Sequence, residues 1–176
     1  MSFSFILMIV FSLFQFDWEF ASSQLRHAAS TDSSSGIAVA NILSLTPSFT
    51  SPYPHPARAF SRFTWELMSQ VASHWMCGVL YEAGTHVVLF QLLRTWSSDT
   101  EVLSWACSAI EKLSACGIPS LQDQMRALHD CEALLRAAAT SGLDVKYDSQ
   151  HSSPASRALR NLGLLRDDDL LVRHAE

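Results

Sequence analysis

The sequence has few charged residues and few glycines, and both shortages exclude classes of protein. Charged side chains make up 16% of the 176 residues, against about 25% in an average soluble protein. The 17 acidic residues outnumber the 12 basic ones, giving a net charge of −5. This argues against a general nucleic-acid binder, which needs a basic face for the phosphates. Hydrophobic residues reach 48%, so the chain as a whole is not of the disordered class.

Motifs that mark active sites are also missing. The 6 glycines form neither a GxGxxG nor a GxxxxGK phosphate loop, and no GxSxG nucleophile elbow is present. His74 and Cys77 could share a metal on one helix face, but the further ligands that zinc requires do not follow at regular spacing. The sequence therefore predicts no catalytic residue, no cofactor and no metal. An all-α enzyme is the least favoured alternative.

The chain divides into an apolar N-terminal segment (residues 1–20), a linker (residues 21–58) and a helical domain (residues 59–176). The run FSFILMIVFSLFQF at residues 3–16 is shorter than the roughly 20 residues of a membrane span and suits the apolar region of a signal peptide. No Lys or Arg precedes it. Three interpretations stay open: a signal or short anchor, a buried core helix, or a stretch that is not natively translated.

The linker is rich in serine and proline. Pro52, Pro54 and Pro56 occupy alternate positions, which blocks a helix and favours an extended, polyproline-like segment. We expect the linker to be disordered, with one short helix allowed at residues 36–45.

Signals for β-strands are absent from residue 59 onward: no Asn-Gly turn joins two runs of alternating β-branched residues. Helical periodicity dominates, and residues 100–115 show it best. Asp99 or Ser98 can cap the start of this helix, and Gly117 with Pro119 ends it. One apolar stripe with the spacing of a helix face contains Val102, Trp105, Ala106, Ala109, Ile110 and Leu113. We expect Trp105 to be buried between helices.

Shorter helices are predicted at residues 86–93, 121–129 and 131–140, and another from Pro154, a residue that the first turn of a helix tolerates. The order of helices in the first half of this domain recurs in the second, and the match between two helices is residue by residue. At one constant offset, Ala106, Ala109, Ile110 and Leu113 correspond to Ala155, Ala158, Leu159 and Leu162. Such self-similarity indicates a repeat.

The four cysteines are Cys77, Cys107, Cys116 and Cys131. All of them lie in or beside predicted helices, in a chain too long for a small disulfide scaffold. We expect four free, buried thiols in a reducing compartment.

Residues 79–115 resemble an armadillo repeat. They contain a short first helix ending at Glu82-Ala83-Gly84, a second helix with Leu92-Leu93, Asp99 in the following loop, and a long third helix of the A-x-x-A-L-x-x-L type. Residues 121–164 resemble a second, more degenerate copy, and residues 59–77 the last helix of a preceding one. The resemblance implies an all-α fold, a short right-handed α-solenoid of about two three-helix repeats.

In that family the third helices bind extended peptides or partner proteins. By this resemblance the contact positions are Ser108 and Lys112 in the first copy and Arg157 and Asn161 in the second, of which only Asn161 matches the family's residue type. Arg160 lies beside them and makes the face basic. We therefore expect an extended or acidic protein segment to bind at Ser108, Lys112, Arg157, Arg160 and Asn161.

The function predicted is a non-enzymatic protein–protein interaction module, a scaffold or adaptor, in the cytoplasm. The alternative is a membrane-tethered or secreted helical protein, targeted by residues 3–16. Many apolar residues lie between Phe60 and Leu80, more than two repeats can cover. Residues 36–45, the N-terminal apolar run, a second copy of the chain or a partner could cover them, and self-association or a partner is favoured.

Overall fold

The computed structural model describes residues 55–70, 74–141 and 153–165. Within these ranges every element is an α-helix and no strand is present, so the predicted all-α class is confirmed. The apolar segment at residues 1–20 and most of the linker lie outside the described residues. The helices are α4 (His55–Gln70), α5 (His74–Glu82), α6 (Thr85–Thr95), α7 (Thr100–Ala115), α8 (Pro119–Ala127), α9 (Cys131–Thr140) and α10 (Pro154–Asn161).

Helix α7 has the bounds that the sequence predicts, because local signals fix both of its ends. The Asp99 carboxylate accepts hydrogen bonds from the backbone N–H groups of Glu101 and Val102, which the first turn of a helix leaves without partners. Beyond the other end, Gly117 has a φ of 70°, a left-handed conformation that suits glycine and stops the helix.

Helix α4 begins inside the predicted linker. The sequence was expected to stay extended up to Arg58, but the helix starts at His55 and carries Pro56 in its first turn. Proline is tolerated there because the first N–H groups of a helix have no intrahelical acceptor.

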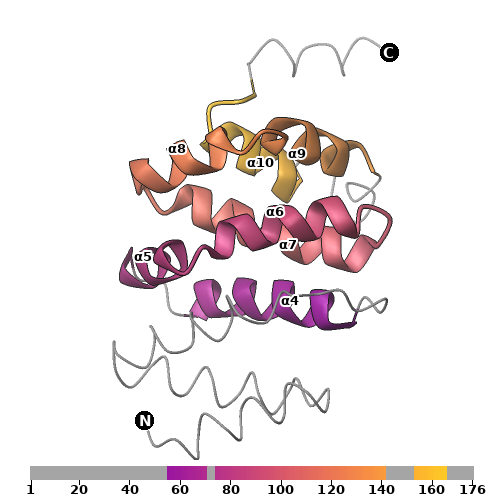
Figure 1. Cartoon of the computed structure of the whole chain (residues 1–176), viewed down its shortest axis with the longest axis horizontal. Coiled ribbons are helices and arrows are strands. Elements are labelled where there is room, and N and C mark those ends of the chain that lie inside the picture. Colours follow the sequence, from indigo (N-terminus) through magenta and orange to yellow (C-terminus); the bar gives the residue numbers. More distant parts are fainter. Residues whose placement is uncertain (1–54, 71–73, 142–152, 166–176) are drawn as a thin grey trace, which may run out of the picture.

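The helices form a stack in which α4, α7 and α10 lie side by side (Figure 1). Helix α7 is the middle one and makes the two most extensive helix–helix interfaces, with α4 and with α10. Helix α6 packs against α7, and α9 against α10. A pair of packed helices therefore occurs twice, α6 with α7 and α9 with α10, and α4 packs against α7 at one end of the stack.

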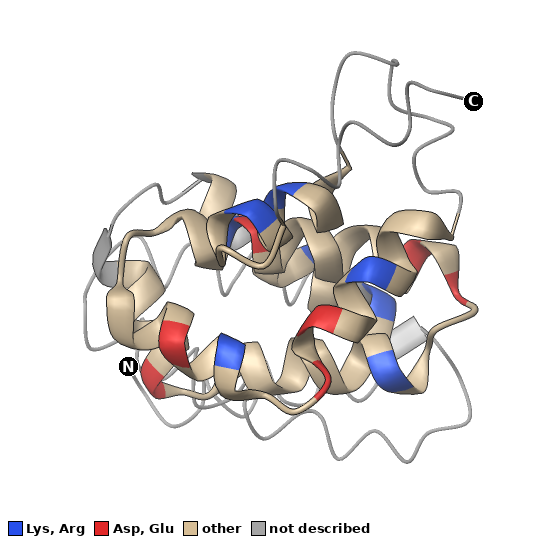
Figure 2. Cartoon of the chain, turned by 90° about the horizontal axis from the view of Figure 1, so that it is seen from above, with Lys and Arg blue, Asp and Glu red and all other residues tan. Residues whose placement is uncertain are grey.

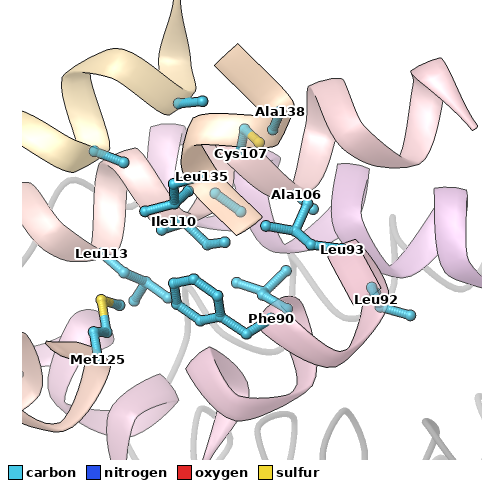
Figure 3. Packing of buried hydrophobic residues seen from close by; sticks show 14 of the residues in the cluster. Phe90, Leu92, Leu93, Ala106, Cys107, Ile110, Leu113, Met125, Leu135 and Ala138 are labelled. Atoms are coloured by element: carbon cyan, nitrogen blue, oxygen red, sulfur yellow. The ribbon is translucent and has the colours of Figure 1, made fainter. Parts of the chain in front are cut away.

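One continuous hydrophobic core joins these layers. Figure 3 shows Phe90 of α6, Ile110 and Leu113 of α7, and Leu135 of α9 pointing toward one another. Five of the apolar residues for which we expected an external cover are buried: Phe60, Phe63, Met68, Met76 and Leu80. Trp65 and Val79 are partly buried. Among the described residues the large exposed hydrophobic side chain is Val87, at 46%.

The prediction of four free thiols is wrong. Cys77 of α5 and Cys116, directly after α7, form a disulfide whose Cα atoms are 6.5 Å apart. Cys107 and Cys131 are free and buried, as expected. The pairing was not visible in the sequence because it joins residues 39 positions apart and depends on how the short helix α5 folds back toward the end of α7.

No single helix in the described part of the chain has both the length and the apolar composition to cross a membrane. The segments Met76–Glu82 and Thr85–Thr95 have the required length and composition only when taken together, and the chain bends by 68° between them.

Candidate partner-binding face

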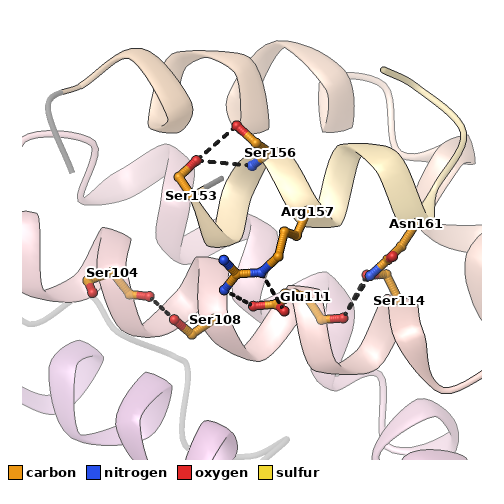
Figure 4. Close-up of polar contacts among 8 residues, drawn as sticks. All are labelled: Ser104, Ser108, Glu111, Ser114, Ser153, Ser156, Arg157 and Asn161. Atoms are coloured by element: carbon orange, nitrogen blue, oxygen red, sulfur yellow. Dashed lines mark hydrogen bonds and ion pairs between the residues drawn. The ribbon is translucent and has the colours of Figure 1, made fainter. Parts of the chain in front are cut away.

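The face predicted to bind a partner lies where α10 packs beside α7. Arg157 contacts Glu111 and, further along both helices, Asn161 contacts Ser114. Since residue numbers increase together on the two helices, α7 and α10 run parallel. The structure thus brings Arg157 and Asn161 of α10 against α7 (Figure 4).

Arg157 forms a two-pronged ion pair with Glu111. Its Nε and Nη2 atoms donate to the two carboxylate oxygens, each at 2.8 Å. The side chains are 33% and 19% exposed, so the pair is partly shielded from water. The planar guanidinium matches both carboxylate oxygens, a geometry that strengthens the pair and fixes its orientation.

Asn161 and Ser108 are also occupied within the chain. The Asn161 amide donates to the Glu111 carbonyl at 3.4 Å and to the Ser114 hydroxyl at 3.1 Å. Ser108 is buried, and its hydroxyl donates to the Ser104 carbonyl one turn earlier in α7. The contacts of Arg157 and Asn161 hold α10 against α7. Two of the five predicted residues therefore stabilise the interface between the two helices, whereas the Ser108 hydroxyl is bonded within α7.

Lys112 and Arg160 are different, because their side chains are exposed. Within the described residues neither forms an ion pair, whereas each of the other basic residues there has an acidic partner. Those residues are Arg58, Arg62, Arg94, Arg126, Arg136 and Arg157. Figure 2 shows acidic and basic residues interspersed over the described helices. Among the described Lys and Arg residues, Lys112 and Arg160 are thus the two whose charge no described acidic side chain pairs.

An aromatic contact joins α4 to α7 and was not predicted. The ring centroids of Trp65 and Trp105 are 5.0 Å apart with the planes tilted by 51°, and the Arg62 guanidinium lies 5.8 Å from the centre of a Trp105 ring. Both distances fall in the range of favourable aromatic and cation–π contacts. Trp105 lies between helices as expected, but it is half-buried rather than fully buried.

Ion pairs connect the start of α7 to α4. Arg58 donates to both carboxylate oxygens of Asp99 and also pairs with Glu101. Burial opposes ionisation of Asp99, but the hydrogen bonds from Arg58 and from the backbone N–H groups of Val102 and Glu101 outweigh it and lower the pKa of this carboxyl. Asp99 thus caps α7 and binds its neighbour in the stack.

A second arginine–aspartate pair repeats this arrangement one layer later. Arg94 of α6 donates to both oxygens of Asp130, the residue before α9. The hydrogen bond from Arg94 lowers the pKa of Asp130. The sequence indicated Asp99 as a capping residue but gave no sign of its partner Arg58, and the pair of Arg94 and Asp130 was not predicted.

His86 is a buried histidine at the start of α6. Its ring lies 5.7 Å from that of Tyr81, and Nδ1 has no hydrogen-bond partner among the described residues. Burial lowers the pKa of His86, and a hydrogen bond with Gln124 of α8 opposes this only in part. The neutral imidazole is therefore the form that the fold accommodates.

The described residues contain no group of three or more His, Cys, Asp or Glu side chains placed to hold a metal ion. Cys77, which the sequence placed beside His74 as a weak metal candidate, has its sulfur in the disulfide. Comparison with protein-family models, with curated proteins and with solved structures finds no match to this chain.

Proposed function

We propose that the chain is a non-enzymatic protein-interaction module, built as a short right-handed solenoid of about two armadillo-like three-helix repeats. The observation that supports this is the side-by-side placement of α4, α7 and α10, with α6 packed against α7 and α9 packed against α10. The helix triplets α5–α7 and α8–α10 are then the two repeats, and α4 is the last helix of a preceding one. Stacked repeats of this kind present extended surfaces that bind other proteins.

The partner proposed is an extended acidic protein segment that binds across α7 and α10. Lys112 and Arg160 are the residues assigned to this contact, because they are exposed and carry charges that no described acidic side chain pairs. Of the other predicted contacts, Arg157 and Asn161 position α10 against α7 and so shape the surface, whereas Ser108 is buried and bonded within α7. A cytoplasmic scaffold or adaptor role belongs to this proposal.

The test compares binding of fluorescent acidic peptides to the original chain and to a Lys112→Gln, Arg160→Gln variant. Removing two positive charges should weaken binding by at least about tenfold at low salt, since charge pairs at an interface steer and hold an oppositely charged ligand. A matched control, Gln91→Glu with Ser120→Glu, changes the net charge equally at exposed positions of α6 and α8. Equal losses in both variants would assign the effect to net charge and contradict the proposed face.

The disulfide favours a second candidate, a secreted or membrane-tethered helical protein targeted by residues 3–16. Stable disulfides persist mainly in oxidising compartments, and Cys77 and Cys116 are joined in this structure. Fractionation of a tagged full-length chain separates the candidates. Recovery from the medium or the membrane pellet supports the second, and recovery in the cytosol supports the first.

A further inference from the structure

Helix α5 is the least supported helix of the described stack. It has nine residues, with no acidic residue in its first turn and no basic residue in its last, and isolated helices shorter than about 12 residues are marginal in water. Gly78, in the middle of the helix, costs further helix stability. Among the described helices, α5 has its one substantial helix–helix interface with α6.

A covalent bond supplements this small interface. The disulfide joins Cys77, next to Gly78, to Cys116 at the end of α7, the best-packed helix of the stack. Cys77 is 8% exposed, whereas Cys116 is partly open to solvent. Cys116 is therefore the end of the bond that is more open to a small thiol or disulfide.

The other two cysteines are protected from the same chemistry. Cys107 and Cys131 are 1% and 2% exposed. Burial raises the pKa of Cys107 to about 12, and burial together with the neighbouring Asp130 and Glu132 raises the pKa of Cys131 to about 11. Since the thiolate is the reactive form of cysteine, both side chains stay inert near neutral pH.

We propose that Cys77 and Cys116 form a reversible, redox-controlled link that fastens α5 to the end of α7, closed by exchange with low-molecular-weight disulfides and opened by low-molecular-weight thiols. In the closed state α5 is held by packing and by the bond. In the open state it is held by packing alone, so it separates from α6 more often and exposes Met76 and Leu80, which are buried in the closed structure.

The closing reaction balances as two successive exchanges. The Cys116 thiolate attacks one sulfur of oxidised glutathione, forms a mixed disulfide and releases one glutathione thiolate. The Cys77 thiolate then attacks the Cys116 sulfur, forms the internal bond and releases the second glutathione thiolate. The two released thiolates take up the two protons that the cysteines lost. Two electrons thus pass from the cysteine pair to glutathione, and reduced glutathione reverses both steps.

The experiment equilibrates the full-length chain in buffers of stepped ratios of reduced to oxidised glutathione, without denaturant. Alkylation and mass measurement then count the free thiols. We expect Cys77 and Cys116 to close and reopen together as the ratio changes, with Cys107 and Cys131 free throughout. Hydrogen exchange should be at least about tenfold slower in α5 in the oxidised chain, and unchanged in α9.

Variants assign these effects to the bond. Cys116→Ser should keep α5 in the fast-exchanging state in every buffer, and Cys131→Ala, which leaves the bond intact, should behave as the original chain does. A bond that opens only in denaturant would overturn the proposal and favour a permanent link of the secretory type. A bond that never forms, or α5 exchange that ignores the redox state, would overturn it too. The thiol count needs no variant, so it decides even if Cys116→Ser fails to fold.

Discussion

Arg157 and Arg160 share one short helix, yet their surroundings give them different roles. Arg157 is held by both oxygens of Glu111 on the neighbouring helix, whereas the Arg160 side chain is exposed. An arginine bound to its own fold contributes to stability, and an exposed arginine is available to a ligand. The sequence placed both on one binding face because it showed their spacing but not their partners.

We expect Arg157→Ala to lower the free energy of unfolding by about 1–2 kcal/mol, since it removes charge-assisted hydrogen bonds and leaves the partly buried Glu111 carboxylate without this partner. Arg160→Ala, the matched control on the same helix, should change it by less than about 0.5 kcal/mol. Urea unfolding followed by circular dichroism measures both. If the two variants were equally stable, the Arg157–Glu111 pair would contribute nothing to the free energy of unfolding.

His86 should make stability depend on pH. Its pKa is lowered in the fold from the ordinary value of 6.5 because the charged ring would be buried. The unfolded chain therefore binds a proton more readily, and the stabilisation present above pH 6.5 is lost as the pH falls toward the folded pKa. We expect the urea midpoint to drop between about pH 7.5 and 5.5, and to drop less in His86→Gln, which cannot titrate. An identical pH profile in that variant would assign the dependence to other groups.

At the scale of single helices, the ends of α7 could be predicted because adjacent residues in the sequence determine them. Asp99 and Gly117 fix the ends of α7 through contacts and conformations of residues next to them in the sequence. The structure confirms the expected bounds of this helix and of α9. The pairing of Cys77 with Cys116 and the register of α10 on α7 could not be predicted. Both depend on how separate helices pack, and no local pattern encodes that packing.

Asp99 is the residue through which one helix end can be tested. Asp99→Ala removes the cap of α7 and the partner of Arg58 together, and should cost about 1–2 kcal/mol or more of unfolding free energy. Asp99→Asn keeps an oxygen for the backbone N–H groups and loses only the charge, so its cost should be smaller. The pKa of the Asp99 carboxyl is lowered in the fold from the ordinary value of 3.8. The stability that the ionised carboxylate contributes is therefore lost as the pH falls below 3.8 and through the folded-state pKa. Equal costs for the two variants would mean that the cap contributes nothing.

At the scale of the whole chain, the hydrophobic core bears on whether the protein needs a partner to fold. The expectation of self-association rested on apolar residues between Phe60 and Leu80 that two repeats alone would leave uncovered. The structure buries the main ones, Phe60, Phe63, Met68, Met76 and Leu80, inside the chain. Self-association stays a prediction, but these side chains no longer require it.

A core shared by all layers should also make the stack unfold in one step. Phe60 of α4 and Leu159 of α10 lie at opposite ends of the stack, and both belong to the same buried cluster. We expect Phe60→Leu to cost about 1 kcal/mol and Leu159→Ala about 2–5 kcal/mol. In thermal unfolding monitored by calorimetry and by tryptophan fluorescence, each change should shift one common transition, and the two costs should add because the sites are not in contact. Separate transitions, one moved only by Phe60→Leu and the other only by Leu159→Ala, would instead mean that the repeats unfold as nearly independent units, as long helical arrays can.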